Sequence, residues 1–88
     1  MPTYFFNVIS EGRRAFDHEG QECASLEAAM DVAELSLCEI AGEALKFGSK
    51  VLIEAIVNSD DAGNELARKT AEATFLPRFA AFTKFRQQ

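Results

Sequence analysis

Five residues in one short stretch carry side chains that could bind a metal ion or move a proton: Asp17, His18, Glu19, Glu22 and Cys23. Carboxylates with one imidazole can hold a divalent cation, and a histidine beside an acid can act as a general base. The stretch is also polar and contains Gly20, which is typical of a connecting turn. Neighbouring side chains in a turn need not converge, and the sequence has no second His to complete a common zinc set. We expect a turn here and keep a divalent-metal or small-molecule site as the alternative.

The other residues that could act in catalysis lack the required spacing. No serine lies in a nucleophile elbow, and the single His gives no triad. Asp60 and Asp61 belong to a turn without the spaced oxygen ligands and closing Glu of an EF-hand. We therefore expect no enzymatic activity and no cofactor.

The last thirteen residues differ in charge from the rest of the chain. They contain three bases and no acid, net +3, whereas residues 1–75 contain six bases and fourteen acids, net -8. The segment also holds three aromatic residues, and the three bases and three aromatics are our candidate interaction residues: Arg78, Phe79, Phe82, Lys84, Phe85 and Arg86. One interpretation is that the phenylalanines fold back over the sheet and complete a small core. The other is an exposed aromatic surface that binds a partner.

The composition argues against two classes of partner. With a net charge of -5, the chain lacks the basic face that neutralises phosphates, so we expect no nucleic acid; single-strand binding through the tail is the weakest hypothesis. The apolar run at residues 4–9 lacks a basic n-region and is far shorter than a membrane span. We expect no signal peptide, no membrane partner and a cytoplasmic location.

The longest periodic segment is residues 25–47, where apolar residues recur every three or four positions. This spacing predicts an amphipathic helix that packs one face on a core. Ser25 is placed to cap its N-terminus, and Gly48 is suited to end it. A helix of this length would also hold Cys23 and Cys38 roughly 20 Å apart, which excludes a disulfide between them.

Short segments with strand character lie on both sides of this helix. Alternation and aromatic content predict a central strand at residues 3–10, a turn at Glu11-Gly12 and an edge strand at 13–16. Residues 51–57 are nearly all apolar and predict a second central strand. The polar turn at 59–64 favours an antiparallel partner at 65–75, although the residue types there favour a helix, which stays open as the alternative.

Together these elements predict one α+β domain at residues 1–75. It has a small antiparallel sheet in the order β-β-α-β-β with the long amphipathic helix on one face. Residues 76–88 form a separate C-terminal arm, in which Pro77 suits the first turn of a short helix.

The opening Met-Pro-Thr-Tyr-Phe-Phe, the Asp-His-Glu-Gly-Gln-Glu turn at 17–22 and the Ala- and Glu-rich helix that follows carry a resemblance. In these three features the chain resembles a family of short bacterial proteins known only as a domain of unknown function. The likeness runs through Gly63, and the Phe-rich tail looks like an extension. The resemblance implies a compact α+β domain in a bacterial cytosol, and it implies no activity, cofactor or catalytic residue.

From the sequence we therefore expect a small non-catalytic interaction or regulatory module that forms a homodimer. In such a dimer the acidic body of each copy would meet the basic, aromatic arm of the other.

Overall fold

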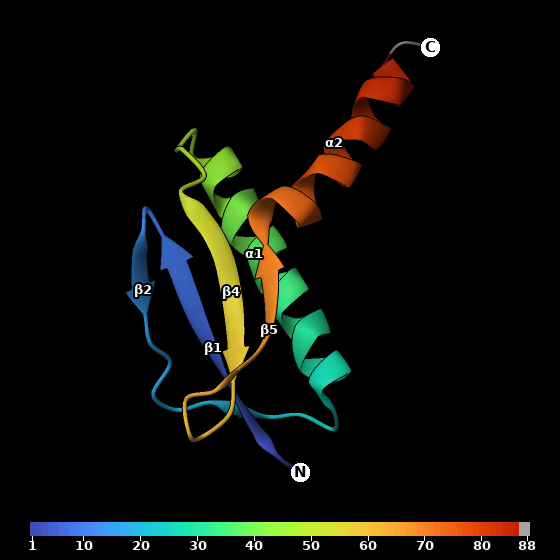
Figure 1. Ribbon diagram of the computed structural model, residues 1–88. Helices are drawn as coiled ribbons and strands as arrows, with labels where there is room; N and C mark the ends of the chain where they lie inside the picture. Colours follow the sequence, from blue (N-terminus) through green and yellow to red (C-terminus); the bar gives the residue numbers. More distant parts are fainter. Residues whose placement is uncertain (87–88) are drawn as a thin grey trace.

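The computed structural model describes the backbone of residues 1–86 and the side chains of residues 1–79. It confirms the predicted α+β class: one antiparallel sheet is crossed on one face by a long helix, α1 (Leu26–Lys46) (Figure 1). The strands are β1 (Thr3–Ser10), β2 (Arg13–Ala15), β3 (Gln21–Glu22), β4 (Ile53–Ser59) and β5 (Glu65–Thr70), and a second helix, α2 (Ala71–Arg86), follows β5. The strand order is β2-β1-β4-β5, so the two apolar strands β1 and β4 are central as expected.

The turn between β1 and β2 shows why the chain reverses at Glu11-Gly12. Both residues have positive φ, 52° for Glu11 and 76° for Gly12. A two-residue turn with both central residues in the left-handed region matches the right-handed twist of antiparallel strands. The hairpin therefore pairs Ser10 directly with Arg13.

Strand β3 corrects the prediction that residues 17–22 are only a turn. Gln21 and Glu22 pair with Tyr4 and Thr3 of β1, while β2 pairs with the other end of β1. Two residues are too few to show an alternating pattern, so this pairing left no signal in the sequence.

The core lies between α1 and the sheet. Ala33 and Leu37 of α1 pack on Ile53 and Ile56 of β4, and Ala29 packs beside the buried Tyr4 and Cys23. Phe6 contacts both groups and joins them into one core. The small Ala side chains at 29 and 33 are fully buried, which allows α1 to lie close to the strands.

The two ends of α1 follow the predicted signals. The Ser25 hydroxyl accepts the Ala28 N–H at 3.1 Å, so Ser25 is the N-cap. At the other end Gly48 has φ 69°, the left-handed conformation that commonly follows a helix. Cys23 and Cys38 are both free, as the length of the helix required.

The prediction for residues 65–75 was wrong in its second half. The strand ends at Thr70, whose hydroxyl accepts the Ala73 N–H at 3.1 Å and so caps a helix that begins at Ala71. The hairpin with β4 explains the strand, and the Ala- and Glu-rich residues that follow explain the helix. Pro77 consequently lies in the interior of α2, not in its first turn.

Helix α2 gives the molecule its elongated shape. Its beginning packs beside α1 and β4, where Phe75 contacts the core, and its remainder leaves the body of the domain (Figure 1). The Cα atoms extend over 48 × 25 × 18 Å. Because α2 begins at Ala71, the boundary expected at residue 75 falls inside one continuous helix.

Candidate interaction surface

The carboxylate of Asp17 is bonded to the protein backbone. One oxygen accepts the N–H of Phe6 at 3.1 Å, and the other accepts the N–H groups of Glu19 and Gly20, each at 3.1 Å. The Asp17 N–H in turn donates to the side-chain oxygen of Asn7 at 2.9 Å. Asp17 thus bonds to β1 at Phe6 and Asn7, between the segments paired with β2 and β3, and holds the loop against the strand.

These bonds also set the acidity of Asp17. Burial of the carboxyl opposes ionisation, but the N–H groups of Gly20, Phe6 and Glu19 stabilise the charged form, and His18 adds a favourable charge interaction. The net result is a pKa below the usual value of an aspartate. Asp17 is therefore ionised at neutral pH and already has three donors.

The other candidate metal ligands do not gather around Asp17. His18, Glu19 and Glu22 are exposed, whereas Cys23 is buried against Tyr4 and Ala29. Among the described residues no group of three or more His, Cys, Asp and Glu side chains is arranged to hold a metal ion. A depression of about 290 Å³ is lined by Asp17, His18 and the turn after β4, but it does not include Glu19, Glu22 or Cys23.

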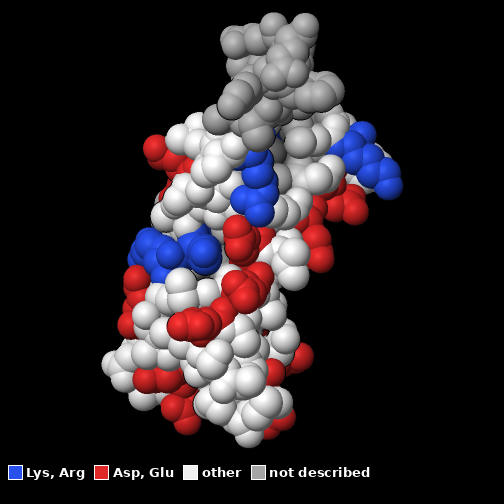
Figure 2. Space-filling view, turned by 90° about the vertical axis from the view of Figure 1, so that its right-hand side faces the viewer, with Lys and Arg blue, Asp and Glu red and all other residues white. Residues whose placement is uncertain are grey.

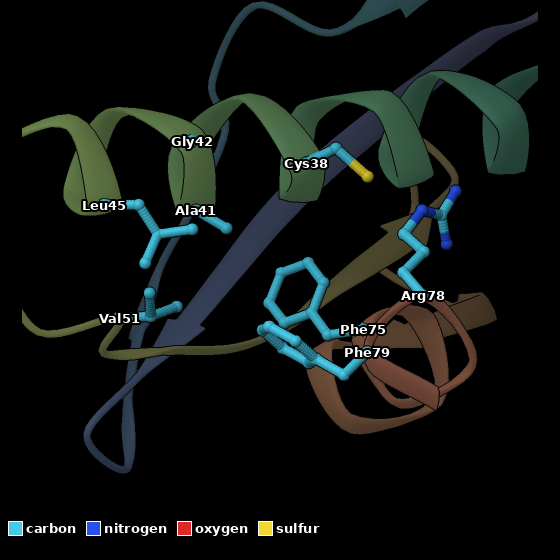
Figure 3. Close-up of a pocket in the computed structure, with 8 residues that line it drawn as sticks. All are labelled: Cys38, Ala41, Gly42, Leu45, Val51, Phe75, Arg78 and Phe79. Carbon is cyan, nitrogen blue, oxygen red and sulfur yellow. The ribbon is translucent and has the colours of Figure 1, made fainter. Parts of the chain in front are cut away.

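An apolar hollow lies between the two helices. It is a groove of about 540 Å³ lined by α1, α2 and the connector after α1 (Figure 3). We call it the α1–α2 groove. Its lining residues are Cys38, Ala41, Gly42, Leu45, Val51, Phe75, Arg78 and Phe79. In Figure 3 the rings of Phe75 and Phe79 lie opposite Ala41 and Leu45, so both sides of the groove are apolar.

Two contacts fix the angle at which α2 leaves the domain. Phe75 packs on the core between α1 and β4. Arg78 forms an ion pair with Glu34 of α1 at 3.2 Å and also donates to the Thr74 carbonyl at 2.6 Å. The ion pair is largely exposed, so it contributes about 0–1 kcal/mol and serves chiefly to orient the two helices.

Three of the apolar side chains that line the groove are exposed. They are Leu45 (65% exposed), Phe79 (55%) and Val51 (38%), and Phe47, Leu52 and Leu76, which are near them in the chain, are exposed as well. Single exposed apolar residues are normal, but several that line one groove are typical of an interaction site. This end of the molecule therefore carries the strongest signal for a binding surface.

Of the six candidate interaction residues, the structure places two. Arg78 and Phe79 both line the α1–α2 groove. Phe82, Lys84, Phe85 and Arg86 belong to α2, but their side chains lie outside the described residues. The alternative interpretation, in which the phenylalanines cover the sheet, does not apply to Phe79, which is exposed beside α1.

The α1 half of the groove was not predicted from the sequence. Leu45 lies near the end of α1 and Val51 in the connector, and neither was among the candidate interaction residues. The available signal was Leu45, an apolar residue near the end of the predicted helix. Cys38 also lines the groove and is only partly buried.

The charge is unevenly distributed around this surface. Figure 2 shows acidic side chains over the lower half of the face and no Lys or Arg there among the residues in colour. Along α1, Glu27, Asp31 and Glu34 precede Cys38, Ala41 and Leu45 at helical spacing. One side of α1 is thus acidic in its first half and apolar where it borders the groove.

Comparisons with known proteins identify a family but no activity. The family model described as Domain of unknown function (DUF6894) matches residues 3–72. No curated protein and no solved structure matches the chain. No helix among the described residues is long and apolar enough to cross a membrane.

Proposed function

The chain belongs to the family described as a domain of unknown function, DUF6894, and from this starting point we propose that it is a non-catalytic protein-interaction module that forms a homodimer. The observation that supports this proposal is the α1–α2 groove with the exposed apolar residues around it. Burying that surface against a partner removes apolar area from water, which contributes about 25 cal/mol per Å² before the costs of association.

The groove supports binding better than catalysis. Its lining has one charged residue, Arg78, and that side chain is already paired with Glu34. A catalytic site needs a nucleophile, an acid or a base placed at the reacting atoms. Among the described residues that line the groove, the only nucleophilic side chain is Cys38, and none is a His or a carboxylate.

The open face of the sheet is a weaker candidate for the interface. Its central residues Ala55 and Val57 are buried, although no helix covers this face in the described part of the chain. At the α1–α2 groove, by contrast, the large apolar residues Leu45, Val51 and Phe79 are exposed. We therefore place the dimer interface at the groove.

The test measures the mass of the full chain in solution by light scattering over a range of concentrations. The proposal expects twice the 9.7 kDa of one chain at high concentration, with dissociation on dilution. A mass of one chain at every concentration up to the millimolar range would contradict the homodimer.

Two leucines of α1 provide a matched pair of variants for the same measurement. Leu45 lines the groove and is 65% exposed, whereas Leu35 is 63% exposed and does not line it. Leu and Lys have similar helix propensities, so both Leu→Lys changes leave the fold intact. Leu45→Lys should weaken the dimer at least about tenfold, as loss of a central apolar contact does, and Leu35→Lys should change it little.

A further inference from the structure

The two sides of the α1–α2 groove come from elements that a second copy would present again. Phe75 and Phe79 lie four residues apart on α2 and line the groove from one side. Leu76, next to Phe75, is 57% exposed. A surface that carries both an apolar groove and an apolar helix can bind its own copy through a two-fold axis, because each partner then supplies the same two parts.

Resting on the proposed homodimer, we infer that the α1–α2 groove of each copy receives α2 of the other copy, with the two α2 helices antiparallel. The occupant is thus a second copy of this chain. Helix α2 leaves the domain body, so it is placed to reach a neighbour (Figure 1). Its 16 residues span about 24 Å.

The charges of α2 set the antiparallel direction. Its first turn carries Glu72, and its last turns carry Lys84 and Arg86 in the sequence. In an antiparallel pair the basic end of one helix meets the acidic start of the other and the acidic body behind it. A parallel pair would bring the two basic ends together, and repulsion of like charges would oppose it.

The same charges disfavour other occupants of the groove. The body has a net charge of -8, and Glu34 lies at the junction of the two helices. An anionic membrane surface or an acidic peptide would be repelled, whereas the arm at 76–88 has a net charge of +3. The best match in charge and apolar character is therefore α2 of a second copy.

A charge exchange between two full-length variants tests this arrangement. One chain carries Glu72→Lys and the other Arg86→Glu. Each variant alone places like charges at both ends of the antiparallel pair, so each homodimer should weaken about 3- to 30-fold. When the two are mixed, Lys at 72 faces Glu at 86 and Glu72 faces Arg86, so a heterodimer should form with an affinity near that of the wild type. If one of the two variants is isotopically labelled, native mass spectrometry distinguishes the heterodimer from the two homodimers and gives the amount of each.

Cys38 reports on the groove in the same samples. It lines the groove, and Cys23 is buried in the core and serves as an internal reference for folding. We expect a thiol reagent to label Cys38 at least about tenfold more slowly in the dimer than in the dissociated chain, with Cys23 protected throughout.

The outcomes separate the inference from the proposed function. Two results would overturn the binding of α2 in the partner's groove while leaving the homodimer in place. One is a wild-type dimer whose Cys38 is labelled at the monomer rate, and the other is a pair of variants that shows no preference for the heterodimer. A wild-type chain that stays monomeric would overturn both. Circular dichroism of each variant shows that loss of association is not loss of fold.

Discussion

The N–H of Phe6 donates to the carboxylate of Asp17 at 3.1 Å, between the segments of β1 that pair with β2 and with β3. Because Asp17 also accepts from Glu19 and Gly20, one side chain satisfies three backbone donors. Removing it leaves the part-buried Phe6 N–H without its partner. We expect Asp17→Ala to lower the free energy of unfolding by about 1–3 kcal/mol in urea denaturation. Asp61→Ala, at an exposed position, should stay within about 0.5 kcal/mol.

The same carboxylate makes stability depend on pH. The pKa of Asp17 is lower in the folded chain than in the unfolded chain, so the unfolded chain takes up the proton first as the solution is acidified. The stabilisation is fully present above the unfolded pKa and is lost as the pH falls through the folded pKa. The difference in the free energy of unfolding between wild type and Asp17→Ala should therefore be constant above about pH 5 and shrink below about pH 4. A gap that widens on acidification would contradict this assignment.

Gly20 is required by its closeness to β1. It has φ 73°, and a Cβ added there would lie 2.6 Å from Thr3 Cγ2 and 3.0 Å from Phe5 Cε1. Gly63 has φ 86° but has no atom within 4 Å of such a Cβ. Both Gly→Ala variants lose about 1–2 kcal/mol to the left-handed backbone. Gly20→Ala should lose about 1–3 kcal/mol more, because the side chains of Thr3 and Phe5 must move away from the added Cβ. Equal losses in urea denaturation would show that the loop moves away at no cost.

Replacing either of two buried asparagines by Leu should change the free energy of unfolding in opposite directions. The side chain of Asn58 is fully buried and neither of its polar atoms has a partner among the described residues, whereas Asn7 donates to Ser59 Oγ at 3.0 Å and accepts from the Asp17 N–H. Asn58→Leu removes two unsatisfied groups and should raise the free energy of unfolding by about 1–3 kcal/mol. Asn7→Leu should lower it by a similar amount. If Asn58→Leu destabilises the chain in urea denaturation, Asn58 has a partner or a role that its burial does not show.

The elements that could be predicted were those with a long or repeated signal. The helix at Leu26–Lys46 has a cap, a stop and six turns of apolar spacing, and β1 has alternation over eight residues. The prediction for the segment after the β4–β5 turn was wrong beyond Thr70. The turn favours a strand and the Ala-rich composition favours a helix, and the chain forms a strand up to Thr70 and a helix after it. Local propensity does not show where one replaces the other.

The candidate site was half predicted for a related reason. Phe79 and Arg78 were identified because their types are unusual in a short segment. Leu45 and Val51 were not, since an apolar residue gives the same sequence signal whether it faces the core or a groove. Only the position of α2 beside α1 distinguishes these cases, and that position depends on Phe75 reaching the core across forty residues of chain.

Pro77 lies in the interior of α2 and lacks the N–H that would bond to the Ala73 carbonyl. Pro77→Ala restores this donor and should stabilise α2 by about 1–3 kcal/mol, with a gain of helical signal in circular dichroism. Pro77→Gly restores the donor without the helix propensity of Ala, so its free energy of unfolding should lie between those of the wild type and Pro77→Ala.

The direction of α2 also shapes the groove, where Phe75 and Phe79 lie on either side of Pro77 in the chain. A straighter α2 moves Phe79 relative to Leu45, so Pro77→Ala should raise the free energy of unfolding at low concentration yet weaken the dimer in light scattering. If both quantities rise together, the proline does not set the angle on which the interface depends.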